Sequence, residues 1–472
     1  MVFNSFDFIS FFFVVWCAIA VVTRFTKLVI IRNICLLLAS YYFYGSFNIV
    51  FLAILAYVTG VNYVGGLCLK RAQQNKTVVS IIILLTLLPL ITFKYSAFLI
   101  YDVLGISQSA DNDWITHLIL PIGISFFTFQ ALSYTIDLYR NKITQCRNII
   151  DFALFVAFFP TILSGPIEKA RHLLPQLRRV NSIHGKDLMI GCSYFVWGIF
   201  KKCVVADRLA NYVDWAYSSV DYVPAGTLAL AAIFYSIQIY CDFSGYSDMA
   251  IGAARCLGFS LSPNFCFPYF STRIKDFWRK WHISLTSWFT EYVYFSLGGN
   301  RVRLKVHWIF NISMVFLLSG IWHGAAWNFL LWGAMHAILY LIEYLAGLQR
   351  KDFTYRNWSY KIIAGFVVFI LVTMAWMFFR IDDVVVVIRI LTNICMNGIL
   401  SIALGASTVT FAINLMVLVL LIVFEILLYR HRNEGDAIIS HHTTLQVAWI
   451  LSLILLTALF GMSNDNFVYF QF

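Results

Sequence analysis

The chain has 472 residues, of which 61% are hydrophobic, 18% aromatic and only 12% charged. Soluble domains carry about 25% charged residues, so this composition excludes a soluble globular protein. The formal net charge of +11 is explained by basic loops that face anionic lipid headgroups, and we expect no nucleic-acid partner.

Apolar runs of about 18 residues or more recur along the whole chain, and each is long enough to cross a bilayer. We therefore expect an all-α polytopic membrane protein with about eleven or twelve transmembrane helices. No hydrophilic linker divides the chain, so residues 1–472 are expected to form one integral membrane domain. The expected spans are 6–23, 28–44, 48–67, 78–101, 115–139, 188–206, 226–243, 306–322, 324–345, 361–379, 408–428 and 445–462.

The distribution of Lys and Arg predicts the orientation. They gather in alternate loops such as 24–32, 70–76 and 273–305, whereas 102–113 and 212–225 contain acidic residues and no basic ones. Positively charged loops face the cytoplasm, which places the N-terminus outside. The opening MVFNSFDF has no basic stretch and no cleavage site closes the first apolar run, so we expect the first helix to be retained.

Two segments do not fit a plain helical bundle. The apolar stretch 152–170 is broken by Pro160 and by Gly165–Pro166, and its flanks are basic, which indicates a re-entrant segment. Lys201 and Lys202 end another apolar run. Broken backbone and charge at membrane depth are tolerated only where they are buried in protein or line a wet cavity. We therefore expect the helices to surround a central cavity.

The segment RIKDFWRKWHISLTSWF (273–289) is amphipathic when it is placed on a helix. At 100° per residue, its apolar arc contains Trp278, Trp281, Leu285, Trp288 and Phe289. This pattern predicts one interfacial helix that lies in the membrane plane, with its tryptophans at the headgroups. His282 lies at the edge of the apolar arc. It is either an interfacial histidine without another role or a functional one.

A second histidine, His323, lies in SGIWHGAAWNF (319–329). Gly320 and Gly324 remove side-chain bulk around it, so a substrate or another helix can approach. On a helix, Ala326 and Trp327 share its face. Burial favours the neutral imidazole, which is the form a general base needs. The alternative is a structural histidine between packed helices, and His336, which has no glycines around it, is predicted to be structural.

Together these segments resemble a known family. WRKWHISL followed 41 residues later by GIWHGA is similar to the paired-histidine signature of the membrane-bound O-acyltransferase (MBOAT) family. FFTFQALSYTIDLYR (126–140), FFPTILSGPIEKA (158–170), DFSGYSDMAIG (242–252) and the opening MVFNSFDF also resemble it, with a signature core over about 115–345. His282 at the first histidine position is typical of the bacterial branch that O-acetylates alginate and peptidoglycan.

The resemblance implies the MBOAT fold and an O-acyltransferase in a bacterial cytoplasmic (inner) membrane. It implies that His323 is the catalytic base and that His282 is its partner, which positions substrate or donates a proton. The aromatic residues expected to wall the cavity are Trp278, Trp281 and Trp327. Further candidates near the substrate are Asp242, Asp248, Arg279 and Asn328, each with a structural role as the alternative.

By the same resemblance the acyl donor is acetyl-CoA, which the basic helix 273–280 and the loop 169–186 would attract. The acyl group would pass to a separate extracytoplasmic acyltransferase that modifies a cell-surface polysaccharide, because no hydrophilic domain able to handle a polymer is evident. No tightly bound cofactor is expected. The ten cysteines lack CxxC or zinc-type spacing, so neither a disulfide nor a metal site is expected.

Two other functions remain open. Within the family, the chain could transfer D-alanine from a carrier protein towards teichoic acid. From a different class, it could be a transporter or flippase with an intramembrane histidine. Transporters often contain two related halves, and WHISL and GIWHG each occur once in this sequence, which counts against the transporter.

Overall fold

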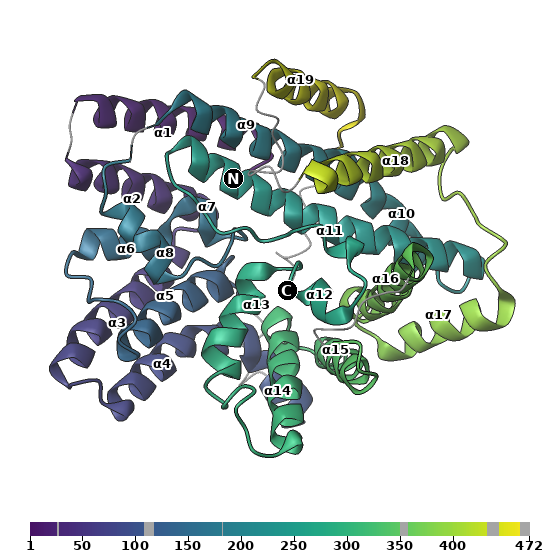
Figure 1. Ribbon diagram of the computed structural model, residues 1–472, viewed down its shortest axis with the longest axis horizontal. Coiled ribbons are helices and arrows are strands. Elements are labelled where there is room, and N and C mark those ends of the chain that lie inside the picture. Colours follow the sequence, from purple (N-terminus) through teal and green to yellow (C-terminus); the bar gives the residue numbers. More distant parts are fainter. Residues whose placement is uncertain (26–27, 108–117, 182, 350–356, 432–442, 463–472) are drawn as a thin grey trace. The chain divides into compact units, whose positions relative to one another are not determined.

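The computed structural model describes residues 1–25, 28–107, 118–181, 183–349, 357–431 and 443–462 (Figure 1). These ranges are helical and contain no strand, and nine of their helices are long and apolar enough to cross a membrane. The predicted all-α polytopic class is therefore confirmed. The chain divides into two compact units: unit 1 is Met1–Phe195 with Met249–Ser262, and unit 2 is Val196–Asp248 with Pro263–Phe472. A single membrane domain over the whole chain stays a prediction.

Unit 1 contains the first helices of the chain. They are α1 (Phe6–Phe25), α2 (Val29–Gly45), α3 (Phe51–Arg71), α4 (Lys76–Leu90) with its π-helical continuations η1 (Ile91–Tyr95) and η2 (Phe98–Val103), α5 (Ile124–Tyr139), α6 (Ile149–Ala157), α7 (Phe159–Ile162), α8 (Ala170–Leu177) and the start of α9 (Gly185–Ile199). α3 packs against both α4 and α5. The expected span 115–139 corresponds to α5, which begins at Ile124 and is buried along almost its whole length; residues 115–117 lie outside the described ranges.

The opening residues of the chain pack into the core of unit 1. Phe3 and Phe8 are fully buried, and their ring centroids are 4.5 Å apart. The ring of Phe8 also lies 5.8 Å from Phe43 of α2 and 6.3 Å from Phe159 of α7. Buried aromatic pairs stabilise a core beyond the area they bury. The aromatic residues of the motif MVFNSFDF therefore have a structural role, because they pack the start of α1 against α2 and α7.

The broken segment 152–170 is buried in protein, as the sequence predicts. α6 ends at Ala157, and α8 begins only at Ala170. Two buried side chains of α2 hold the far end of α8, because Arg32 Nη2 and Asn33 Nδ2 donate to the carbonyl oxygen of Leu177 at 2.7 and 2.8 Å. A cation at a helix C-terminus is favourable. Entry of this segment from the cytoplasmic side stays a prediction.

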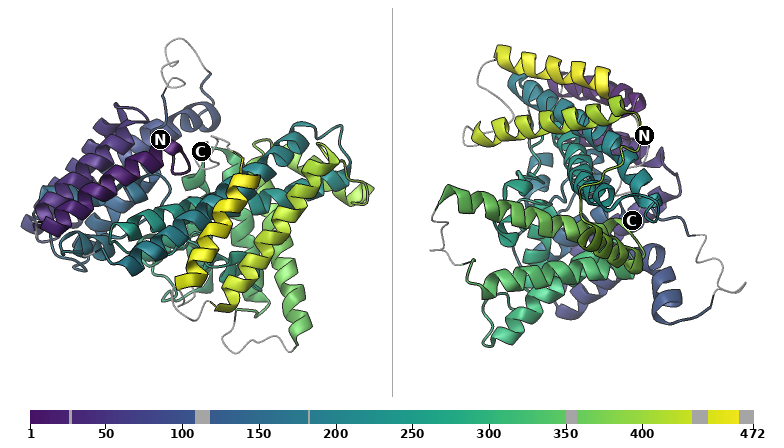
Figure 2. Two further views of the ribbon diagram at one scale, coloured as in Figure 1. Left: turned by 90° about the horizontal axis from the view of Figure 1, so that it is seen from above. Right: turned by 90° about the vertical axis from the view of Figure 1, so that its right-hand side faces the viewer.

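Unit 2 contains the remaining helices. They are the π-helix η4 (Phe200–Ala206), α10 (Asp207–Ser218), α11 (Ala225–Cys256, whose last residues belong to unit 1), η5 (Pro268–Phe270), α12 (Ile274–Trp278), α13 (Ile283–Phe289), η6 (Thr290–Tyr294), α14 (Lys305–His323), α15 (Trp327–Leu345), α16 (Trp358–Arg380), α17 (Val384–Asn397), α18 (Thr408–His431) and α19 (Thr443–Phe460). α18 and α19 lie side by side, with the rings of Phe424 and Trp449 5.0 Å apart (Figure 2).

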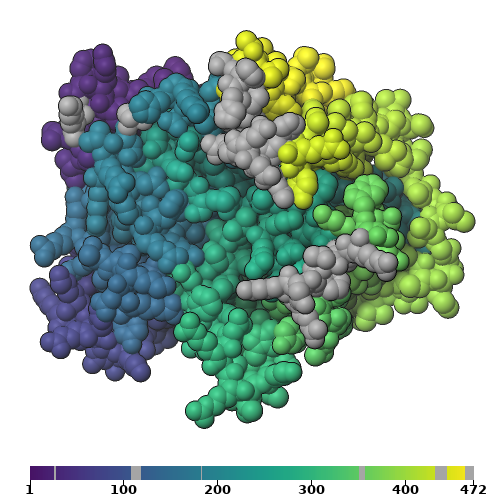
Figure 3. All heavy atoms as spheres, in the orientation of Figure 1, coloured from purple at the N-terminus to yellow at the C-terminus, as the bar shows by residue number. Residues whose placement is uncertain are grey.

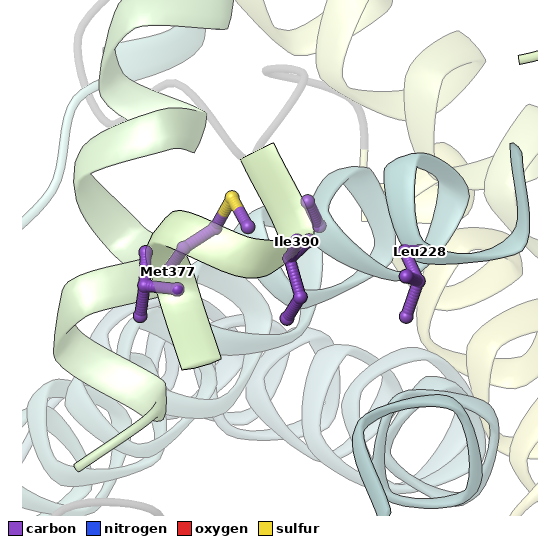
Figure 4. Packing of buried hydrophobic residues seen from close by; sticks show 5 residues of the cluster. Leu228, Met377 and Ile390 are labelled. Atoms are coloured by element: carbon purple, nitrogen blue, oxygen red, sulfur yellow. The ribbon is translucent and has the colours of Figure 1, made fainter. Parts of the chain in front are cut away.

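One helix of unit 2, α17, was not expected, because 14 residues are too short for a span. Its buried residues Val387 and Ile390 pack with Leu228 of α11 and Met377 of α16 (Figure 4). α17 is therefore fixed by tertiary packing. Figure 3 shows the face seen in Figure 1 with all heavy atoms drawn as spheres, so that side chains cover the ribbons there.

The two lysines at the end of an apolar run are both buried in ion pairs. Lys202 Nζ lies 2.8 Å from Asp207 Oδ1 and 2.7 Å from Asp242 Oδ1. Lys201 Nζ lies 2.5 Å from Asp248 Oδ2 and also donates to Ser244 Oγ. Of the two settings expected for charge at this depth, the structure shows burial in protein for these lysines. The motif DFSGYSDMAIG supplies three of these partners, Asp242, Ser244 and Asp248, which favours a structural role for them.

Candidate active site

The segment around His282 is not one helix, and the prediction of a continuous interfacial helix over 273–289 is wrong. α12 ends at Trp278 and α13 begins at Ile283. Between them, His282 adopts the left-handed conformation with φ 42° and ψ 55°. The apolar residues expected at the lipid headgroups are instead buried in protein. A non-glycine residue in this conformation costs about 1–2 kcal/mol, so its surroundings must hold it there.

Residues distant in the sequence hold this break. The carbonyl oxygen of Asn264 accepts from the N–H of Ile283 at 2.8 Å, which fixes the start of α13. Glu343 of α15 accepts from the N–H groups of Ile274 and Lys275 at 2.6 and 3.0 Å. A carboxylate at a helix N-terminus satisfies its unpaired amides, so Glu343 caps α12.

The side chain of His282 is buried in a polar network on one side and aromatic rings on the other. It is 1% exposed, and its Nδ1 lies 2.9 Å from Asn264 Oδ1. The ring of Phe243 on α11 lies 4.6 Å from the imidazole. Burial lowers the pKa of His282 well below its ordinary value, because desolvation penalises the charged ring. His282 is therefore neutral at physiological pH.

His323 is the last residue of α14 and is 4% exposed. The backbone is extended at Gly324 and Ala326. The prediction that Ala326 and Trp327 share the helical face of His323 is therefore wrong. The rings of Trp322, Trp332 and Phe379 lie 4.9, 5.0 and 5.2 Å from the imidazole.

The glycines around His323 allow α14 and α15 to approach closely. A Cβ on Gly320 would overlap the carbonyl oxygen of Phe329, and one on Gly324 would overlap the Phe329 ring. From the sequence, two roles were possible for these glycines, access for a substrate or close packing of another helix, and the structure shows close packing. It fixes the turn in which His323 lies.

The ring of Trp322 lies near both candidate histidines. Its ring centroid is 5.8 Å from that of His282 and 4.9 Å from that of His323. The structure therefore brings together the two residues that the sequence singled out, 41 positions apart. His336 also contacts Trp332, at 4.9 Å between ring centroids, and its other near ring is Trp278 at 4.8 Å.

Unit 2 also contains a cavity of about 880 Å³, and neither His282 nor His323 is among the residues that line it. Its lining combines basic side chains, aromatic rings and Ser319, which lies one helical turn before His323 on α14. The basic residues are Lys275, Arg279, Arg303 and Lys305, and the aromatic residues include Trp278, Phe289, Trp308 and Tyr340. Such a combination suits a ligand with both anionic and apolar parts. Among the residues that the structure describes, no cluster of His, Cys, Asp or Glu could hold a metal ion.

The other predicted site residues lie in different settings. Trp278 and Arg279 line the cavity, whereas Trp281 is buried against Trp376, with ring centroids 4.8 Å apart. Trp327 is 53% exposed. Asn328 is buried and donates to the carbonyl oxygen of Phe378 at 3.2 Å.

The ion pair of Asp242 with Lys202 and the hydrogen bond of Asn328 both favour structural roles for these two residues. Sequence reasoning missed Asn264, Ser284 and Trp322. Trp322 stands next to His323 in the motif, but nothing in SLSPNF (260–265) marks Asn264 as a partner of His282.

Known proteins resemble this chain over much of its length. The family model of the membrane-bound O-acyltransferases (MBOAT) matches residues 36–381. The chain is 39% identical to the probable alginate O-acetylase AlgI of Azotobacter vinelandii, over 75% of this chain and 70% of that protein. It is 34% identical to the peptidoglycan O-acetyltransferase of Helicobacter pylori, over 77% and 74%. It is 28% identical to the teichoic acid D-alanyltransferase of Bacillus subtilis, over 47% and 58%.

The fold and the comparisons thus define a multi-pass integral membrane enzyme that transfers acyl groups to oxygen. The chain belongs to the membrane-bound O-acyltransferase family.

Proposed function

We propose that the protein moves an acetyl group from cytoplasmic acetyl-CoA to a hydroxyl on the outer side of a bacterial inner membrane, for O-acetylation of a cell-surface polysaccharide. The observation that carries the proposal is the pair of buried histidines, His282 and His323, around Trp322. The relatives named for alginate and peptidoglycan O-acetylation match at higher identity and over more of the chain than the D-alanyltransferase does.

In the proposed reaction His323 is the general base. It takes the proton of the acceptor hydroxyl as the oxygen attacks the thioester carbonyl, which gives a tetrahedral intermediate. The carbon–sulfur bond then breaks, and the coenzyme A thiolate takes the proton from the imidazolium. His323 is 4% exposed, and a general base needs the neutral form of the imidazole.

The 880 Å³ cavity is the proposed donor site. Lys275, Arg279, Arg303 and Lys305 offer positive charge for the phosphates of coenzyme A, and the aromatic rings offer contact for its less polar parts. All four basic residues lie in the segment 273–305, which the charge pattern predicts to be cytoplasmic.

The proposed acceptor side faces outside. Three of the connections expected there, at 46–50, 219–224 and 324–326, are short, and the sequence shows no hydrophilic domain able to handle a polymer. An extracytoplasmic acyltransferase is therefore the proposed partner that carries the acetyl group to the polysaccharide.

The test is transfer from labelled acetyl-CoA in membranes that contain wild type, His323→Ala or His336→Gln, at equal expression and matched thermal stability. Loss of a positioned base lowers rate by about 10²–10⁴-fold, so we expect that loss for His323→Ala. His336→Gln is the matched control, a buried histidine of the same unit, and should stay within about threefold, far from the effect of a lost base.

Three results would contradict the proposal. Equal rates for wild type and His323→Ala would make His323 structural. Transfer from a D-alanylated carrier protein, but not from acetyl-CoA, would favour the teichoic acid pathway. Solute uptake by proteoliposomes without covalent acyl transfer would favour a transporter.

A further inference from the structure

We propose that Asn264 is a positioning residue for His282: its side-chain oxygen holds the ring as the tautomer with hydrogen on Nδ1, so that Nε2 presents a lone pair. The inference deepens the proposed function and rests on it, because it assigns the direction in which His282 exchanges protons or hydrogen bonds. The juxtaposition lies wholly within unit 2.

The first step is the orientation of the Asn264 amide. Its Oδ1 lies 3.3 Å from the backbone nitrogen of Ser284, and its Nδ2 lies 2.9 Å from Ser247 Oγ on α11. A backbone N–H can only donate, so the atom that faces it must be the oxygen. Ser284 Oγ donates to the same oxygen at 2.9 Å. The amide therefore has one consistent orientation.

The second step is the tautomer of His282. Its Nδ1 lies 2.9 Å from that same oxygen. A carbonyl oxygen only accepts, so Nδ1 must carry the hydrogen. In a neutral imidazole the other nitrogen then has the lone pair. Neutral His282 can thus accept a hydrogen bond or a proton at Nε2, and it cannot donate one there. Of the two roles expected for His282, proton donation is therefore disfavoured.

The third step is the rigidity of this arrangement. Asn264 holds the His282 region at two points, through its side chain and through its carbonyl oxygen, which accepts from Ile283. Asn264, His282 and Ser284 are each buried at 3% exposure or less. For histidines that bind a metal, removal of the group that orients the ring through its second nitrogen costs about 10–100-fold in activity, and we expect a loss of the same order for Asn264.

The direct test is ¹⁵N NMR of the full-length protein in detergent, with histidine labelled and His282→Ala used to assign the signal. Protonated and unprotonated ring nitrogens have different ¹⁵N shifts. We expect His282 to show hydrogen on Nδ1 in wild type and in Ser247→Ala. A signal with hydrogen on Nε2 in wild type would overturn the inference, whatever the enzyme transfers.

The kinetic test compares Asn264→Asp, Asn264→Leu and Ser247→Ala with labelled acetyl-CoA. A carboxylate still accepts from Nδ1 but raises the pKa of the ring. Asn264→Asp should therefore keep most of kcat and move the acid limb of kcat/KM to higher pH. Asn264→Leu should lose about 10–100-fold in kcat with KM for acetyl-CoA little changed. Ser247→Ala removes only the partner of the amide nitrogen and should keep kcat within about threefold, below that range.

Two results would contradict the positioning role. An unchanged kcat in a folded Asn264→Leu would show that the tautomer needs no help from Asn264. If the acid limb of kcat/KM does not move in Asn264→Asp, the carboxylate at position 264 does not act on the His282 ring in a way that affects the rate. If Asn264→Leu does not fold, Asn264→Asp alone tests the positioning role. A wild type that transfers no acetyl group from acetyl-CoA would contradict the proposed function instead, and the NMR spectrum would still decide the tautomer.

Discussion

At the scale of single residues, two features of His282 are each unfavourable in free energy, and a purely structural residue seldom has both. Its backbone is left-handed, and its imidazole is desolvated. Strained residues of this kind concentrate at functional sites, where the surrounding structure enforces them. Phe243, Asn264 and Ile283 provide that enforcement.

Burial of His282 predicts a pH dependence of stability. Because its pKa in the folded protein lies well below the ordinary 6.5, the unfolded state binds the proton first as pH falls. The free energy of unfolding should therefore decrease below about pH 6.5, by at most about 1.4 kcal/mol per pH unit for this one group. Thermal unfolding in detergent between pH 5 and 7.5 measures it. His282→Leu should show a shallower dependence, and parallel curves for the two proteins would contradict the prediction.

The sequence identified both histidines but not their surroundings. His282 and His323 could be found because a titratable ring in an apolar segment stands out, and the resemblance supplied their pairing. Asn264 could not be found in this way, because it precedes His282 by 18 residues and lies in a loop whose sequence shows no hydrophobic periodicity. Its importance comes from a contact that only the folded chain makes.

At the scale of elements, long apolar runs predicted most of the helices, because length and hydropathy are properties of each segment alone. The failure at 273–289 has a different cause. Its amphipathic period is real, yet Glu343 accepts from the first N–H of α12 and Asn264 accepts from the first N–H of α13, so the segment forms two helices. α17 was missed because its burial depends on Leu228 and Met377, which belong to other helices.

The crossing of α14 and α15 gives a test at this scale. In Gly320→Ala the added Cβ would overlap the carbonyl oxygen of Phe329, which is backbone and cannot rotate away. We expect a loss of about 1–3 kcal/mol in stability and a lower kcat, because His323 lies one turn further along α14. Thermal unfolding and acetyl transfer measure the two effects.

A matched control for Gly320 exists on α3. A Cβ on Gly60 would meet no atom within 4 Å, and alanine favours a helix over glycine by about 0.5–1 kcal/mol. Gly60→Ala should therefore be neutral or slightly stabilising and leave kcat unchanged. If Gly320→Ala behaved in the same way, the close approach of the two helices would not matter for the position of His323.

At the scale of the whole molecule, the family match over residues 36–381 runs through both compact units. α9 and α11 each contribute residues to both of them. The prediction of a single membrane domain is based on the lack of a hydrophilic linker in the sequence. Composition can reveal such a linker, but it cannot reveal how contacts cluster once the chain has folded.

The orientation in the membrane can be tested with cysteines that the chain already has. Starting from an N-terminus outside, alternate spans put α17 outside and the loop after α11 in the cytoplasm. Cys395 on α17 and Cys266 in that loop are both exposed. A membrane-impermeant maleimide added to intact cells should therefore label Cys395, and it should label Cys266 only after the membrane is permeabilised.

Variants of the two cysteines separate the sites. Cys395→Ser should lose the labelling seen in intact cells, and Cys266→Ser should keep it. Labelling of Cys266 in intact cells would reverse the orientation and place the basic residues of the cavity outside. Acetyl-CoA is a cytoplasmic donor, so the cavity could then not be its site. The acceptor would be the ligand to examine there, although the histidine pair around Trp322 would be unaffected.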